Sequence, residues 1–169
     1  MQEQDIYGKY GVYLPKILDD LSQRIQEAND RVKQETGQKL FEHFNARVKQ
    51  AASMEEKCQR KNLPRAPESA LKEIRDAIGI RIVCGFIEDI YQTIEVLRQL
   101  EGCEIVLEKD YIRAAKPNGY RSYHLILEVE TPYEDCHGQN PGRYFVEIQL
   151  RTIAMDSWAS LEHQMKYKH

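Results

Sequence analysis

Three polar side chains that could act on a charged ligand lie two residues apart in one short segment. In Val146-Glu-Ile-Gln-Leu-Arg151, apolar and polar residues alternate without a break. An extended strand would therefore place Glu147, Gln149 and Arg151 on one surface and the three aliphatic residues in a core. A carboxylate in an otherwise apolar strand must be paired, metal-bound or protonated, because its desolvation is costly. The segment predicts a ligand site on a strand, with Glu147 as a candidate functional group.

A second carboxylate, Asp76, stands just before Gly79 and the apparent strand Ile80–Cys84, which carries Arg81. Two carboxylates from different elements can hold Mg²⁺, which takes one or two protein oxygens and completes its shell with water and substrate phosphate. Asp76 and Glu147 are therefore the candidate metal ligands, and Mg²⁺ the candidate cofactor. On spacing alone, a solvated helix residue is the commoner role for an aspartate such as Asp76.

A basic edge is predicted on the helix that follows residue 50. Four polar residues there are spaced by four, four and three positions, and an arginine precedes them: Lys49, Ser53, Lys57 and Arg60, with Arg47 before. Such an edge near a helix start suits phosphate groups, because the helix dipole also favours anions there. The alternative is a solvated basic face that pairs with Glu55 and Glu56 along the helix.

The aromatic part of the candidate site lies in Lys116-Pro-Asn-Gly-Tyr-Arg-Ser-Tyr-His124. Pro-Asn-Gly predicts a tight turn, and the ring of Tyr120 at its exit could stack on a base. Arg47 and Arg81 could likewise flank a planar ring, or lie in water. Taken alone, Tyr120 is an ordinary strand-end tyrosine, and His124 is more often structural than catalytic. Together the four signals predict a pocket for two nucleotides, with a phosphate cradle and a metal site.

The elements that must position these residues alternate between helix and strand. Apolar spacing predicts helices over residues 15–34 (ending at Gly37), 53–62 (opened by a capping box at Ser53), 71–77, 86–100 and beyond 152. Strands are expected over 80–84, 105–112, 123–129 and 144–150, with a hairpin turn at 138–142, while 41–49 is ambiguous. The last helix places Ala154, Trp158, Leu161 and Met165 on one side. The pattern predicts an α+β (α/β) fold with a mixed β-sheet flanked by helices.

Size and charge limit the classes of partner. The 169 residues suffice for one domain with a core but not for two ordinary ones. Because 24 Lys+Arg nearly balance 27 Asp+Glu, we expect no stable nucleic-acid partner and no attraction to an anionic membrane. Four well-separated cysteines, of which Cys84 and Cys103 are expected in the core, favour a reducing compartment over zinc or disulfides. No apolar run is long enough to span a membrane, so we expect a soluble, cytoplasmic protein.

At these residues the chain resembles the (p)ppGpp synthetase domain of Rel/Spo homologues, especially the single-domain small alarmone synthetases. Lys116–His124 is similar to the acceptor-nucleotide loop of that family, and the segment from Val146 to His163 is similar to its strand-to-helix signature. The similarity extends from about Arg47 to Lys168. It implies a nucleotidyltransferase-like synthetase fold in a single domain over 1–169, with an N-terminal helix within 1–36 and a catalytic core over 41–169. The C-terminal helices that usually assemble such enzymes into tetramers are expected to be absent, which leaves monomer or dimer open.

The resemblance implies a GTP pyrophosphokinase that transfers the β,γ-pyrophosphate of ATP to the ribose 3′-OH of GDP or GTP, with Mg²⁺, in the stringent response. Asp76 matches a metal ligand, and Glu147 matches the glutamate that binds metal and accepts the 3′-OH proton. On the ATP side the resemblance places Arg47, Lys49, Ser53, Lys57 and Arg81. On the acceptor side it places Tyr120, stacked on guanine, together with Lys116, Asn118, His124, Gln149 and Asp156.

Some features depart from the family pattern. Asp76-Ala-Ile-Gly-Ile-Arg81 exchanges two apolar residues but keeps Asp, Gly and Arg in register. Leu107-Glu-Lys-Asp110 matches neither charge pattern of the long members, so it predicts no preference between GDP and GTP. No histidine is followed by aspartate, so we expect no hydrolase activity. The alternatives are a catalytically silent nucleotide-binding regulatory module, a toxic synthetase acting on adenosine nucleotides or tRNA, and an RNA-binding protein, which the balanced charge disfavours.

Overall fold

The computed structural model describes residues 4–167, with side chains up to residue 165. The helical elements are η1 (Gly8–Tyr13), α1 (Leu14–Thr36), α2 (Ala51–Arg60), η2 (Ser69–Glu73), α3 (Ile87–Arg98) and α4 (Ile153–Tyr167). The strands are β1 (His43–Val48), β2 (Ile78–Cys84), β3 (Cys103–Asp110), β4 (Tyr123–Thr131) and β5 (Gly142–Thr152). The ambiguous segment before residue 50 is therefore a strand.

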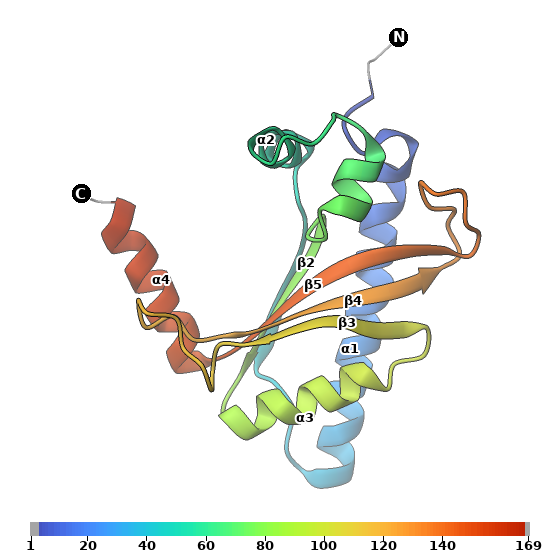
Figure 1. Cartoon of the computed structure of the whole chain (residues 1–169). Helices are drawn as coiled ribbons and strands as arrows, with labels where there is room; N and C mark the ends of the chain where they lie inside the picture. Colours follow the sequence, from blue (N-terminus) through green and yellow to red (C-terminus); the bar gives the residue numbers. More distant parts are fainter. Residues whose placement is uncertain (1–3, 168–169) are drawn as a thin grey trace.

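The strands form one mixed sheet in the order β1-β2-β5-β4-β3. β2 and β5 are parallel at its centre, and the outer pairs are antiparallel. Figure 1 shows α1 behind the strands and α3 below them, whereas α4 leaves the end of β5 and stands to one side. This arrangement confirms the predicted mixed sheet flanked by helices.

The core lies on the face of the sheet that α1 and α3 cover. Val146, Ile148 and Leu150 of β5 are completely buried, as the alternating pattern predicts. The same core contains the buried residues of α1, which follow the predicted apolar stripe: Leu14, Ile17, Leu18, Leu21 and Ile25. The helix ends at Gly37, whose φ of 78° suits a residue without a side chain. Burying one face in this way leaves the polar residues of β5 on the other.

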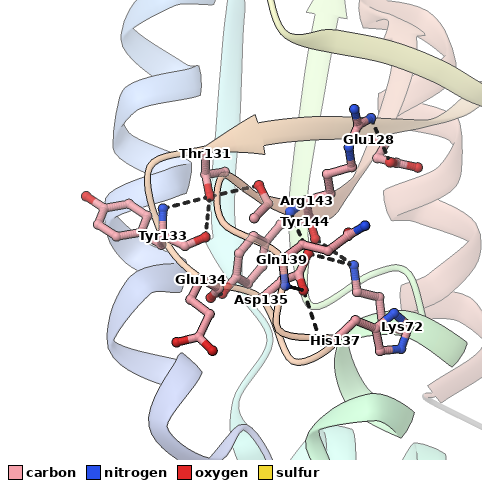
Figure 2. A network of polar contacts seen from close by, with 11 residues as sticks. Lys72, Glu128, Thr131, Tyr133, Glu134, Asp135, His137, Gln139, Arg143 and Tyr144 are labelled. Atoms are coloured by element: carbon pink, nitrogen blue, oxygen red, sulfur yellow. Dashed lines mark hydrogen bonds and ion pairs between the residues drawn. The ribbon is translucent and has the colours of Figure 1, made fainter.

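The loop between β4 and β5 is held by a buried carboxylate, Asp135 (Figure 2). Its Oδ1 accepts hydrogen bonds from the backbone of His137 and Gln139, and its Oδ2 accepts one from the Arg143 backbone at 2.8 Å. The Lys72 ammonium lies 3.4 Å from the same Oδ2 and donates to the Arg143 carbonyl. Asp135 thus ties the predicted hairpin to η2, the element that precedes Asp76.

Two predicted helix boundaries are wrong. The capping box at Ser53 does not form, because α2 already begins at Ala51 and Met54 N bonds to the carbonyl of the N-cap residue, Gln50, at 3.0 Å. The helix expected over 71–77 is a single π-helical turn that ends at Glu73. Ile74 is extended and buried, so the chain turns there to run along the sheet and enter β2. Burial of these side chains outweighs local helix signals.

The predicted apolar side of α4 forms but is exposed. Trp158, Leu161 and Met165 are 39%, 57% and 59% exposed, whereas Met155 at the helix start is buried. Of the two cysteines expected in the core, Cys84 is fully buried and Cys103 is half-buried. Among the described residues, none of the helices is both long and apolar enough to cross a membrane.

Candidate active site

A hollow opens on the polar face of the three strands β1, β2 and β5. Its lining comes from Asn45, Arg47, Gly79, Ile80, Arg81, Glu147 and Gln149. The strand register explains why these residues meet, since Gly79 pairs with Arg47 on one side and with Glu147 on the other. A methyl group on Gly79 would meet nothing within 4 Å among the described residues, so this glycine keeps the floor of the hollow open. The polar residues Glu147 and Gln149 of β5 thus line a concavity.

Asp76 lies just before β2 and is hydrogen-bonded to two lysines. Its Oδ2 accepts hydrogen bonds from Lys49 Nζ at 2.7 Å and from Lys57 Nζ at 2.6 Å. Burial alone would raise the pKa of the Asp76 carboxyl, but the hydrogen bonds and charges of the two lysines outweigh it and lower that pKa. The carboxylate is therefore ionised at neutral pH.

The other oxygen of this carboxylate, Asp76 Oδ1, is buried and has no hydrogen-bond partner within residues 4–167. An ionised oxygen left unpaired in this way is costly, which makes it a ready ligand for a cation or a donor. Among the described residues there is no cluster of three or more acidic, histidine or cysteine side chains able to hold a metal. Mg²⁺ needs few protein oxygens when substrate phosphates complete its shell, so the unpaired oxygen of Asp76 and the carboxylate of Glu147 remain the candidate ligands.

The basic edge predicted on α2 is only partly correct, because Lys49 lies before the helix, which begins at Ala51, and neither Lys49 nor Lys57 is paired along the helix. Lys49 and Lys57 point to Asp76, while Glu55 bonds to Arg65 from the following loop. Ser53 is exposed on the same helix. The alternative of a basic face neutralised by helical ion pairs is thus not what the structure shows.

The residues expected on the acceptor side form one connected network on β4, β5 and the preceding loop. Arg151 Nη2 donates to Tyr120 Oη at 2.7 Å and to Gln149 Oε1 at 3.2 Å. Tyr120 Oη lies 2.9 Å from His124 Nε2, and Gln149 Nε2 donates to Glu147 Oε1 at 2.9 Å. The alternation of β5 predicts Arg151 on this surface but gives it no role, and the structure makes it the centre of the network.

His124 is neutral in this network. Its burial, together with the positive charges of Arg151, Lys116 and Lys109, lowers the pKa of the ring to about 4. At neutral pH the ring therefore carries a single proton, and the nitrogen that faces Tyr120 can accept a hydrogen bond.

The loop that carries Tyr120 is shaped by the predicted turn. Asn118 Oδ1 accepts a hydrogen bond from Tyr120 N at 3.0 Å, and Gly119 has a φ of 86°. The Lys116 ammonium lies over the Tyr111 ring at 4.8 Å and over the Tyr120 ring at 5.5 Å. Asn118 therefore stabilises the backbone of the turn, and Lys116 places its positive charge beside the rings of Tyr111 and Tyr120.

A second hollow of about 670 Å³ lies between the sheet and α4. Its lining includes Arg47, Arg81, Tyr120 and Arg151 on the sheet side and Ala159, Ser160, Glu162, His163 and Gln164 on α4. Asp156 of α4 is tied to the sheet by Arg151 at 3.3 Å and by Arg81 at 3.7 Å. Arg47 and Arg81 line both hollows, so the two lie side by side on this face of the sheet, and the second is of a size that suits a nucleotide.

Comparison with known proteins identifies the family. Residues 46–169 match the model of a region found in RelA / SpoT proteins. The GTP pyrophosphokinase YjbM of Bacillus subtilis is 34% identical over 154 residues, which cover 91% of this chain and 70% of that protein. The chain belongs to the RelA/SpoT family. The GTP pyrophosphokinase YwaC of the same organism is 46% identical over 133 residues, covering 78% of this chain and 61% of YwaC.

Solved structures of this family share the fold. The small alarmone synthetase 1 of Bacillus subtilis superimposes with a TM-score of 0.79 at 32% identity, covering 98% of this chain and 81% of that one. Synthetase 2 of the same organism gives 0.76 at 40% identity, covering 93% of this chain and 78% of that one. Synthetase 1 has also been solved bound to its product pppGpp and bound to AMPCPP. These matches confirm the family resemblance and the synthetase fold expected from the sequence.

Proposed function

We propose that the chain is a GTP pyrophosphokinase that transfers the β,γ-pyrophosphate of ATP to the ribose 3′-OH of GDP or GTP and so makes (p)ppGpp. The chain spans 61% of the length of its relative YwaC and 70% of that of YjbM, both of which are named GTP pyrophosphokinases. Support also comes from a structural neighbour that binds pppGpp and AMPCPP. We place the reaction in the cytoplasm, where ATP and guanine nucleotides are available.

The observation that carries the proposal is the pair of adjacent hollows that share two arginines. One contains Glu147 and Gln149, the other Tyr120 and Arg151, and Arg47 and Arg81 line both. A single-nucleotide site would need one such hollow, whereas a transfer between two nucleotides needs two that lie side by side. Transfer of a phosphoryl-type group depends mainly on alignment and on neutralising charge, and the shared arginines serve both purposes.

On the donor side, Lys49 and Lys57 supply two positive charges against the single negative charge of Asp76. The surplus positive charge, with Arg47 and Arg81 nearby, suits a triphosphate. Ser53 on the exposed edge of α2 adds a hydroxyl donor. The arginine planes of Arg47 and Arg81 flank the adenine in this proposal.

In the reaction, the 3′-oxygen of the acceptor forms a bond to the β-phosphorus of ATP, the bond from that phosphorus to the α-phosphate oxygen breaks, and AMP leaves. Glu147 takes the proton of the 3′-OH. Gln149 occupies Glu147 Oε1, so Oε2 is the oxygen available to the substrate. Mg²⁺, held by Asp76 and Glu147, supplies neutralisation of the phosphate charge when it is bound.

On the acceptor side, the Tyr120 ring stacks on guanine, and the polar groups around it contact the rest of the nucleotide. These groups belong to Lys116, Asn118, His124, Gln149 and Asp156. Lys116 keeps a positive charge beside the Tyr120 ring, where it can meet the acceptor phosphates.

The decisive experiment is a product assay with ATP, Mg²⁺ and each of GDP, GTP, AMP and tRNA. We expect ppGpp and pppGpp from the guanosine acceptors and no product from AMP or tRNA. A product from AMP or tRNA would instead assign the toxic-synthetase alternative, and nucleotide binding without any product would assign a silent module. We also expect purified pppGpp to stay intact with the protein, since we propose synthesis without hydrolysis.

A further inference from the structure

We infer that Arg151 is a positioning residue for the acceptor nucleotide, because its guanidinium fixes where Tyr120 and Gln149 point and which of their atoms remain free for a ligand. The inference rests on the proposed function for the class of that ligand, a guanosine nucleotide. It concerns a residue that holds none of the roles assigned above.

Arg151 joins three elements that border the second hollow. Its side chain is 9% exposed at the end of β5. One nitrogen, Nη2, bonds to Tyr120 on the loop at 2.7 Å and to Gln149 on its own strand at 3.2 Å. The other, Nη1, bonds to Asp156 on α4 at 3.3 Å. A single planar group thus sets the spacing of loop, strand and helix around the site.

The direction of each hydrogen bond follows from the chemistry of the guanidinium, which has donors and no acceptor. Tyr120 Oη must accept from Arg151, so its own hydrogen is free to go to His124 Nε2, 2.9 Å away. Gln149 Oε1 must also accept from Arg151, which turns its amide nitrogen toward Glu147 Oε1. Arg151 therefore fixes the direction of hydrogen bonding in two series of contacts. One runs through Tyr120 to His124, and the other runs through Gln149 to Glu147.

The remaining contacts fit this role. The Arg151 guanidinium lies 5.3 Å from the centre of the Tyr120 ring, so it also holds the plane of the ring proposed to stack on the base. The Arg151 Nε is buried and lacks a hydrogen-bond partner within the described part of the chain. The hydrogen bonds of this side chain are therefore made by its two terminal nitrogens, Nη1 and Nη2, and not by Nε.

The first test compares nucleotide binding by R151M, R151K and the control R143M, using a fluorescent GDP and AMPCPP with Mg²⁺. Losing the anchor of Tyr120 and Gln149 should raise the Kd for GDP about tenfold or more in R151M, with little change for AMPCPP. R151K should lose GDP binding in the same direction, because one ammonium cannot reach three partners in a plane. It also serves as the test variant if R151M does not fold. Arg143 lies on the same strand and pairs with Glu128 at 3.1 Å, so R143M should change neither Kd.

The second readout is the NMR titration of His124 without nucleotide. In the wild type its midpoint should lie near 4. R151M removes one of the positive charges that keep it low, so the midpoint should rise toward the ordinary value of 6.5, and R143M should leave it unchanged. Unchanged GDP binding, equal weakening of GDP and AMPCPP, or an unchanged His124 midpoint in folded R151M would overturn the inference.

The two readouts separate this inference from the proposed function. A wild-type protein that makes no pppGpp, but whose R151M variant shows selective loss of GDP binding and the His124 shift, rejects the proposed function and keeps the positioning role. If the wild-type protein makes pppGpp but its R151M variant binds GDP normally, the proposed function is kept and the positioning role is rejected.

Discussion

Glu147 occupies a half-buried position on a strand whose alternate residues are completely buried. Its Oε1 is taken by Gln149, and the residue across the strand pair is Gly79, which leaves space above it. A carboxylate placed in this way has one oxygen available to a ligand. This position supports the proton transfer proposed for Glu147.

The variant E147Q tests that assignment. It keeps the size and the hydrogen-bonding capacity of the side chain but removes the base, so turnover should fall about 10²- to 10⁴-fold while both nucleotides still bind. Product formation and the two Kd values measure this. E130Q on the neighbouring strand β4 is the matched control and should keep full activity. Normal turnover of E147Q would refute the catalytic role.

Gly79 offers a test of the hollow that does not change any charge. In G79A the added methyl group meets no described atom within 4 Å, so the urea midpoint should hardly change. The methyl group would fill space needed by the ligand, and we expect the Kd for AMPCPP to rise about tenfold. G85A, where the methyl group makes only ordinary contacts, is the control. A normal Kd in G79A would show that the nucleotide does not approach this floor.

Individual site residues differ in how far the sequence could predict them. Glu147 and Gln149 are visible as polar residues at every second position of an apolar strand. The role of Arg151 could not be predicted from the sequence, because it depends on contacts made by tertiary packing. Its partner Tyr120 is distant along the chain, and its partner Asp156 lies on another element, α4. The low pKa of His124 has the same origin, since both its burial and its charged neighbours come from the fold.

At the scale of elements, the β4–β5 hairpin depends on Asp135. The variant D135N keeps one acceptor oxygen but turns an amide group toward the Arg143 backbone, where Oδ2 now accepts at 2.8 Å. Leaving that buried donor unpaired should lower the free energy of unfolding at pH 7 by about 1–3 kcal/mol. Urea unfolding measures this change, and D19N on the exposed side of α1 should have no effect.

The same variant has a defined pH dependence. Burial alone would raise the pKa of Asp135, but backbone hydrogen bonds and Lys72 outweigh it, so the pKa lies below the ordinary 3.8. The ionised group therefore stabilises the fold above the ordinary pKa, and this stabilisation is lost as the pH falls through the lowered value. The difference between wild type and D135N should be constant near neutrality and shrink below about pH 4. A difference independent of pH would show that the charge of Asp135 contributes nothing.

Elements whose apolar residues recur at regular spacing were predictable from the sequence, and elements whose ends are set by tertiary packing were not. The stripe on α1 and the alternation on β5 each bury a continuous face, so sequence and structure agree. The start of α2 and the turn at η2 depend on which side chains the sheet buries, here Met54 and Ile74, and local cap signals could not reveal this. For α4 the apolar spacing is real, but the structure leaves that side exposed.

At the scale of the whole molecule, ligand binding should stabilise the fold, because only the folded chain presents the site. A hundredfold excess of AMPCPP over its Kd with Mg²⁺ adds about 2.7 kcal/mol, which corresponds to roughly 5–10 °C in Tm. EDTA should remove most of this rise in Tm, because without Mg²⁺ only the lysines neutralise the charge of the triphosphate. Differential scanning fluorimetry measures both values, with ADP-ribose as a control nucleotide. An equal rise with EDTA would contradict the proposed metal site.

The parallel pair β2–β5 at the centre of the sheet has a consequence for biosynthesis. β5 leaves the ribosome only after α3, β3 and β4, so a nascent chain can form local helices and hairpins but not this central pair. Glu147 meets Gly79 in that pairing, so the floor of the first hollow is complete only once β5 has joined the sheet. A prematurely terminated chain that ends before β5 therefore lacks Glu147 and the floor of the first hollow, however much of its N-terminal half has folded.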